Sequence, residues 1–90
     1  MNITYDKAKS DRNIAERGLS FDLAADLDWK SAAFYSDTRK DYGEKRFLAL
    51  ALLNDRLHAV VFTPRVDSVH IISFRKANNR EVAKYEQQKA

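Results

Sequence analysis

Cysteine is absent from the chain, histidine occurs only twice, and no apolar run is long. Without cysteine the protein forms neither disulfide bonds nor thiolate zinc sites, and two histidines leave little for any other metal centre. The longest apolar run, residues 47–53, is strand-sized and far short of the roughly 18 residues of a membrane span. The first residues lack the apolar segment of a signal peptide. We therefore expect a cytoplasmic protein with no membrane association and no metal or other cofactor.

The composition is that of a folded protein with an uneven charge. Hydrophobic residues make up 44% of the 90 residues and aromatic residues 11%, which argues against disorder. A chain of this length buries one modest core, so we expect a single domain over residues 1–90. The net charge is +3, yet between Arg39 and Lys76 eight basic residues stand against four acidic ones. The positive charge therefore concentrates in the part of the chain that has strand-like patterns.

Caps, turns and apolar spacing predict an α+β protein in which helices precede a sheet and one more helix follows it. We expect a short strand at 2–5, a helix at 7–17 with Asp6 as N-cap and Gly18 as stop, and a second helix from Ser20. Further along we expect strands at 31–36, 46–53, 56–63 and 69–74. A polar loop at 37–44 and turns at Asn54-Asp55 and 64–68 connect them. The last helix is expected to be capped by Asn78, with Glu81 at its third position.

The most unusual polar residues lie where the last expected strand leads into the last helix. Arg75 and Lys76 end the strand, Arg80 falls in the first helical turn, and Tyr85 follows one turn later. A strand-to-helix junction does not need three cations and a phenol, whereas an anionic partner such as an RNA phosphate does. Arg46 and Arg65 also lie at strand ends, where they could converge with Arg75.

Converging cations and a phenol suit RNA cleavage through the ribose 2′-hydroxyl, because arginine holds the phosphate and stabilises its growing charge without a metal. The base would be a lysine, tyrosine or histidine with a lowered pKa. Each residue also has an ordinary structural interpretation. Glu81 can be a capping carboxylate, Arg65 a solvated turn residue and Tyr85 a packed helix residue. His70 is expected to be partly buried, and His58 is expected at the surface.

Five blocks of sequence occur in an order that one toxin family shares. They are Tyr5-Asp-Lys-Ala-Lys, Asn13-Ile-Ala-Glu-Arg-Gly-Leu-Ser-Phe, Asp37-Thr-Arg with Gly43-Glu-Lys-Arg, Val60-Val-Phe-Thr-Pro-Arg, and Ile71-Ile-Ser-Phe-Arg-Lys-Ala with Glu81 and Tyr85. Together, over about residues 5–85, they resemble the BrnT family of RelE-like ribonuclease toxins from type II toxin–antitoxin systems.

The resemblance implies a RelE-like α+β fold in which N-terminal helices are followed by an antiparallel β-meander and a C-terminal helix. It implies a metal-independent endoribonuclease that inhibits translation and is neutralised by a BrnA-type antitoxin in a heterotetramer. The antitoxin carries the DNA-binding domain, so direct DNA binding by this chain is not expected. The implied catalytic residues are Arg46, Arg65, Arg75, Glu81 and Tyr85, with Glu44 ordering the arginines, and the implied RNA-binding residues are Lys9, Arg17, Arg39, Lys76 and Arg80.

The chain departs from the family pattern before Gly18, where Glu16-Arg17 replaces Lys-His. Arginine stays protonated, so Arg17 cannot exchange a proton as histidine does, although it can hold a phosphate. This departure leaves an alternative function open, a catalytically attenuated interaction domain that only binds its antitoxin.

Overall fold

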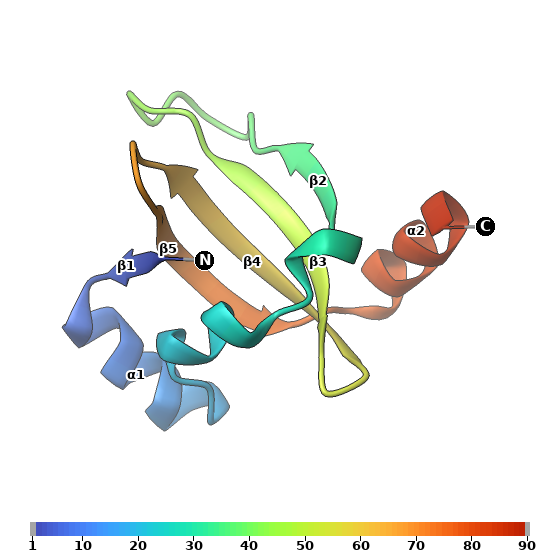
Figure 1. Ribbon diagram of the computed structural model, residues 1–90, viewed down its shortest axis with the longest axis horizontal. Helices are drawn as coiled ribbons and strands as arrows, with labels where there is room; N and C mark the ends of the chain where they lie inside the picture. Colours follow the sequence, from blue (N-terminus) through green and yellow to red (C-terminus); the bar gives the residue numbers. More distant parts are fainter. Residues whose placement is uncertain (1, 90) are drawn as a thin grey trace.

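The computed structural model describes residues 2–89 as one five-stranded sheet with helices on both of its faces (Figure 1). The strands lie in the order β1-β5-β4-β3-β2, with β1 parallel to β5 and all other neighbours antiparallel. In chain order the elements are β1 (Ile3–Tyr5), α1 (Lys7–Arg17), the 3₁₀ helices η1 (Phe21–Asp26) and η2 (Trp29–Ser31), β2 (Ala33–Ser36), β3 (Phe47–Leu53), β4 (Arg56–Pro64), β5 (Val69–Lys76) and α2 (Asn79–Lys89).

The α+β class and the C-terminal helix are confirmed, and two finer expectations are corrected. The sheet is mixed rather than purely antiparallel, because β1 pairs in parallel with β5 through Ile3 and Val69. A three-residue strand carries too little pattern to identify a partner so far along the chain. The segment after Ser20 is a 3₁₀ helix rather than a second α-helix. Only six residues lie between its N-cap, Ser20, and Leu27, whose backbone is already extended.

Local capping and turn chemistry agrees with the sequence-based expectation. The Asp6 carboxylate accepts hydrogen bonds from the backbone of Ala8 and Lys9 at 2.9 and 3.4 Å. Gly18 ends α1 in the left-handed region at φ 71°. Asn54 and Asp55 form the β3–β4 turn with φ 50° and 65°, the pair of positive angles that a type I′ hairpin requires.

Both faces of the sheet are covered, which explains the unbroken apolar run in β3. Ala49, Ala51 and Leu53 pack toward the side of η1, whereas Leu50 packs with Leu57 and α2. Successive strand residues point to opposite faces, so a strand buried on both sides has no polar alternation. The segment from Leu19 through η1 supplies buried side chains to one core, and α2 covers part of the other face (Figure 1).

His58 is buried, contrary to the expectation that it lies at the surface. Its side chain is 3% exposed, contacts the Phe74 ring at 5.4 Å between centroids, and its Nδ1 bonds the Arg56 carbonyl at 2.8 Å. Burial lowers its pKa. The reason is topological, because β4 is the middle strand of the sheet. His70 is half-buried as expected and bonds Thr4 Oγ1 at 2.8 Å.

Candidate phosphate-binding site

Arg75 and Glu81 form a bidentate ion pair at the junction between β5 and α2. Nη1 and Nη2 of Arg75 donate to Oε1 and Oε2 of Glu81 at 2.7 and 2.9 Å. The same carboxylate accepts the Asn78 backbone N–H at 3.0 Å, and the Asn78 side chain accepts the Glu81 N–H at 2.9 Å. This reciprocal capping box begins α2. One carboxylate therefore caps the helix and orients the strand-end arginine.

The ion pair fixes the protonation state of both partners. Hydrogen bonds from Arg75 lower the pKa of Glu81, so its carboxylate is ionised at neutral pH and can only accept hydrogen bonds. Hydrogen bonds to Glu81 raise the pKa of Arg75, against the opposing effects of burial and of the positive charge on Arg39. Glu81 is thus suited to position Arg75 and not to donate a proton.

Arg75 keeps a second pair of donors available. Nη1 uses its two N–H groups on Glu81 and on the Lys76 carbonyl at 3.3 Å, and Nη2 uses one on Glu81. Within residues 2–89, Nε–H and the other Nη2–H of Arg75 form no hydrogen bond. These two N–H groups lie on one edge of the guanidinium and match two oxygens of a phosphate.

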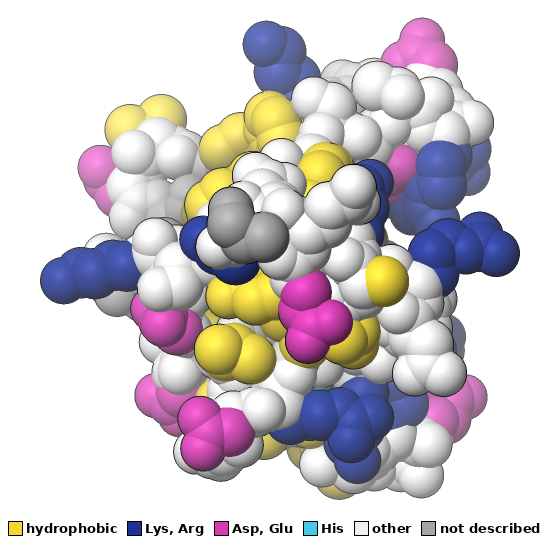
Figure 2. All heavy atoms as spheres, turned by 90° about the vertical axis from the view of Figure 1, so that its right-hand side faces the viewer, with side chains coloured by type: hydrophobic (Ala, Val, Ile, Leu, Met, Phe, Trp, Pro, Cys, Tyr) yellow, Lys and Arg dark blue, Asp and Glu magenta, His cyan; other side chains and the backbone are white. Residues whose placement is uncertain are grey.

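Two cavities of about 320 Å³ each share Arg75 as a lining residue. Other cations border each cavity, so positive charge lies on both sides of the guanidinium. Figure 2 looks toward the end of α2 and shows lysine and arginine side chains spread around the periphery, several of them together on the right-hand side, with apolar side chains exposed near the centre. The first cavity is lined by residues 35–39, Leu48, Val61, Arg75, Glu81 and Lys84, and the second by Arg17, Leu19, Arg75 and Lys76.

Arg39 is held by a carboxylate in the same way as Arg75. Its Nε and Nη2 donate to the two oxygens of Asp37, both at 2.8 Å. The Asp37 side chain is only 4% exposed, while that of Arg39 is 74% exposed. Hydrogen bonds from Arg39 lower the pKa of Asp37, which therefore stays ionised. The predicted RNA-binding residue Arg39 thus lies at the same cavity as Arg75.

Arg17 reaches the site because α1 is fixed against the sheet. The buried Asn13 amide donates to the carbonyls of Leu19 and Phe74, both at 2.9 Å, and its oxygen accepts from Arg17 at 3.0 Å. Asn13 therefore links α1 to the residue that precedes Arg75. Sequence reasoning gave Asn13 no such role, although an asparagine inside a helix is unfavourable enough to indicate one.

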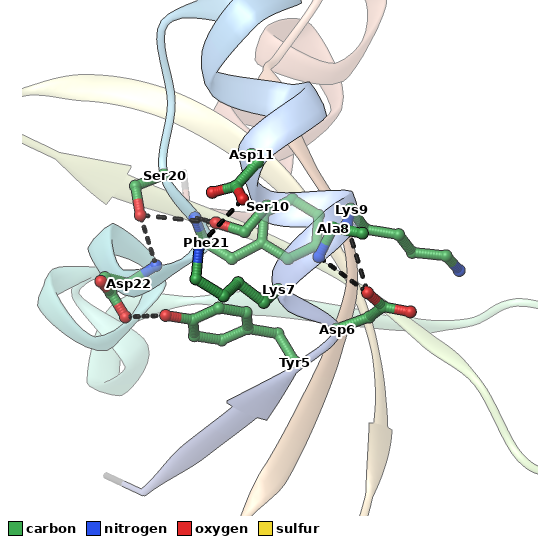
Figure 3. A network of polar contacts seen from close by, with 10 residues as sticks. All are labelled: Tyr5, Asp6, Lys7, Ala8, Lys9, Ser10, Asp11, Ser20, Phe21 and Asp22. Atoms are coloured by element: carbon green, nitrogen blue, oxygen red, sulfur yellow. Dashed lines mark hydrogen bonds and ion pairs between the residues drawn. The ribbon is translucent and has the colours of Figure 1, made fainter.

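A second group of hydrogen bonds holds the start of α1 against η1 (Figure 3). Ser10 Oγ accepts the Phe21 backbone N–H at 2.9 Å, and Ser20 Oγ accepts that of Asp22 at 3.2 Å. The Tyr5 hydroxyl donates to the Asp22 carboxylate. These contacts fix the orientation of the helix whose last residue, Arg17, borders the cavity beside Arg75.

Neither Arg46 nor Arg65 lines a cavity beside Arg75. Arg46 pairs with Glu44 at 3.2 Å and stacks on the Tyr42 ring at 3.8 Å, within a loop cavity of about 640 Å³ that shares residues 36–38 with the first cavity beside Arg75. Glu44 therefore orders Arg46, as predicted, but not Arg75. Arg65 is exposed in the turn before β5, whereas Arg75 lies at the other end of that strand. The structure does not bring the three arginines together, and the roles of Arg46 and Arg65 stay predictions.

The remaining predicted residues are spread around the site. The Tyr85 hydroxyl donates to the Ser31 carbonyl at 3.1 Å, and its ring packs beneath α2, so it borders neither cavity beside Arg75. Lys9 borders a smaller cavity of about 220 Å³ together with Arg17. Arg80 is exposed in the first turn of α2. Sequence reasoning missed Lys84, which α2 brings to the cavity beside Arg75 through long-range packing alone.

Oriented arginines, a carboxylate paired with each, and cavities lined by cations are the features of a small α+β protein that is suited to bind phosphate groups. The family model for the ribonuclease toxin BrnT of type II toxin–antitoxin systems matches residues 5–81. The chain therefore belongs to the BrnT family of ribonuclease toxins. The matched range contains Arg17, Arg75 and Glu81.

No curated protein and no solved structure was found to match the chain. None of the helices within residues 2–89 is long and apolar enough to cross a membrane. In the same part of the chain, no three His, Asp or Glu side chains are grouped so that they could hold a metal ion.

Proposed function

We propose that the protein is an endoribonuclease in which Arg75 holds the scissile phosphate of RNA. The observation that carries the proposal is the free N–H pair of Arg75, fixed by Glu81 between two cation-lined cavities. When the ribose 2′-hydroxyl attacks, negative charge grows on the phosphate, and an oriented guanidinium stabilises it. Arginine supplies this charge itself, so the proposed step requires no metal ion.

The neighbouring cations would hold the phosphates on either side of the scissile one. Arg17 and Lys76 border one cavity, and Arg39 and Lys84 border the other. Each phosphate that such a cation neutralises adds affinity that weakens with salt. RNA would therefore cross the C-terminal end of β5, with Arg75 at the centre of its path.

Membership of the BrnT family supports the biological part of the proposal. Cleavage of RNA would inhibit translation, and a BrnA-type antitoxin would neutralise the enzyme in a heterotetramer. The comparison with a RelE-like fold belongs to the same proposal, supported by the central antiparallel strands and the C-terminal helix.

Expression of the chain without an antitoxin tests this function. We expect growth arrest with degradation of cellular RNA, and we expect Arg75→Ala to restore growth at an equal protein level. Lys30→Ala is the control, because Lys30 is an exposed cation with no assigned role in RNA binding and borders neither cavity beside Arg75. Continued arrest by Arg75→Ala would contradict the assignment of this arginine.

An interaction domain without turnover is the second candidate, and one observation favours it. No histidine lines either cavity beside Arg75, and Arg17 stands where the family pattern has histidine. The cavities thus lack histidine, the side chain that most often acts as a general base near neutral pH. Stable capture of a co-expressed BrnA-type antitoxin, together with intact RNA when the chain is incubated without antitoxin at an amount stoichiometric with RNA, would identify this second function.

A further inference from the structure

The cavity lined by Arg39 and Arg75 combines features that a plain phosphate site does not need. Both arginines are fixed by bidentate carboxylates, and Lys84 adds a third cation to the lining. Beneath them lie the apolar side chains of Leu48 and Val61, neighbours across β3 and β4. A site that served only to bind an anion would gain nothing from an apolar floor.

The side wall of this cavity is rigid. Tyr35 lies on β2 opposite Leu48, and its hydroxyl donates to Gln88 Oε1 of α2 at 2.7 Å. The Lys84 ammonium lies over the Tyr35 ring at 3.9 Å from the centroid. These contacts tie β2 to α2 and hold the cavity open between them, so its shape exists before any ligand binds.

Size and chemistry together indicate one nucleotide as the occupant. The volume of about 320 Å³ lies near the lower end of typical ligand pockets. A nucleobase has apolar faces that rest on apolar side chains or on the plane of a fixed guanidinium, and a polar edge that hydroxyls such as those of Ser36 and Thr38 can contact. The phosphate of the same nucleotide would meet the free N–H groups of Arg75.

We propose that this cavity is a nucleobase subsite that receives one unpaired base beside the phosphate on Arg75, an inference that rests on the proposed function. A base must leave its stack and its pairing to enter, so the subsite selects single-stranded RNA over duplex. Arg39 is then a specificity residue that closes one side of the base pocket. The cavity on the opposite side of Arg75, with Arg17 and Lys76, holds backbone only.

Binding of the whole chain to a short single-stranded oligoribonucleotide tests the subsite directly. The probe carries 2′-O-methyl groups so that it cannot be cut, and a series of probes each lacks one base. We expect one position at which loss of the base weakens binding by about tenfold, with much smaller effects elsewhere. A series in which every position is equivalent overturns the subsite.

A matched pair of variants assigns the effect to this cavity. Leu48→Phe fills the floor of the cavity and should weaken binding of the intact probe about tenfold, to the affinity that the wild-type protein has for the sensitive abasic probe. The variant and the wild-type protein should bind that abasic probe equally. Leu52→Phe is the control, because Leu52 is a half-buried residue of the same strand that lines neither cavity beside Arg75. Equal binding by the wild-type protein and Leu48→Phe would contradict the location.

The outcomes separate the subsite from the proposed function. A chain that binds and cuts RNA with no sensitive base position retains the proposed function and loses the subsite. A chain that neither binds the probe nor cuts unmodified RNA overturns both.

Discussion

At the scale of single residues, two side chains from distant parts of the chain determine where Arg75 lies. Glu81 orients its guanidinium from α2, and Asn13 bonds the backbone carbonyl of Phe74 from α1. Asn13 also accepts a hydrogen bond from Arg17. Asn13 and Glu81, which carry no positive charge themselves, thus position the two cations Arg17 and Arg75.

The positioning role of Glu81 predicts a defect in Glu81→Gln. Glutamine keeps an oxygen for the Asn78 cap, but it offers Arg75 one acceptor in place of two. Because a misplaced contact group is costly to catalysis, we expect RNA cleavage to fall roughly ten- to a hundredfold with helix content unchanged by circular dichroism. Glu86→Gln on the exposed face of α2 is the control. Full activity in Glu81→Gln would show that the ion pair does not orient Arg75.

Arg17 gives a second prediction at this scale. Its side chain borders the cavity beside Arg75, at the position where the family pattern has histidine. A histidine there can exchange protons near neutral pH, which arginine cannot. We expect Arg17→His to raise the cleavage rate and to add a pH dependence centred near pH 6.5, whereas Arg17→Lys should do neither. A pH–rate profile with single-turnover RNA cleavage measures both variants.

At the scale of elements, local chemistry accounts for where helices and hairpins begin and end. Asp6, Gly18, Ser20, Asn78 and the Asn54-Asp55 turn all act within a few residues, so their roles could be predicted from the sequence. The parallel partner of β1 could not, because pairing of Ile3 with Val69 depends on the whole fold.

The contacts of the candidate site also divide into those that local sequence predicts and those that depend on the whole fold. The Arg75–Glu81 pair spans six residues and was partly visible in the sequence, since the cap and the strand end were both recognised. The meeting of Arg39 with Arg75 depends on packing of β2 and α2, and so does the role of Lys84. His58 was wrongly expected at the surface, because a single sequence does not reveal that β4 lies in the middle of the sheet.

The β3–β4 turn predicts a stabilising substitution. Asn54 and Asp55 both have positive φ, a conformation that is strained for residues with a Cβ atom. Asp55→Gly relieves this strain at an exposed position, so we expect a gain of up to about 1 kcal/mol in the free energy of unfolding. Denaturant unfolding of Asp55→Gly and of Asp55→Ala measures it. A glycine variant no more stable than the alanine variant would contradict the turn assignment.

At the scale of the whole molecule, Glu81, Asp37 and His58 link the stability of the fold to acidic pH. Hydrogen bonds from arginine lower the pKa of Glu81 and of Asp37, and burial lowers the pKa of His58. In each case the unfolded chain binds a proton more readily than the folded one, so acid favours unfolding.

The free energy of unfolding should therefore fall in two stages as the pH decreases. The first begins below about pH 6.5, where the unfolded His58 takes up a proton. The second begins below about pH 4.5, where the stabilisation from ionised Glu81 and Asp37 is lost as pH falls through their lowered folded pKa values. Denaturant titrations across this range measure both stages. Glu81→Gln should reduce only the second stage, and stability independent of pH between 7 and 3 would contradict the account.

The measurement that tests the central claim most directly is single-turnover cleavage of single-stranded RNA in excess EDTA. The account predicts cleavage by the wild-type chain, with 2′,3′-cyclic phosphate ends that report attack by the 2′-hydroxyl. We expect a loss of roughly a hundredfold in Arg75→Ala and unchanged cleavage in Lys30→Ala. Cleavage that requires an added metal, or that proceeds equally well in Arg75→Ala, would contradict it.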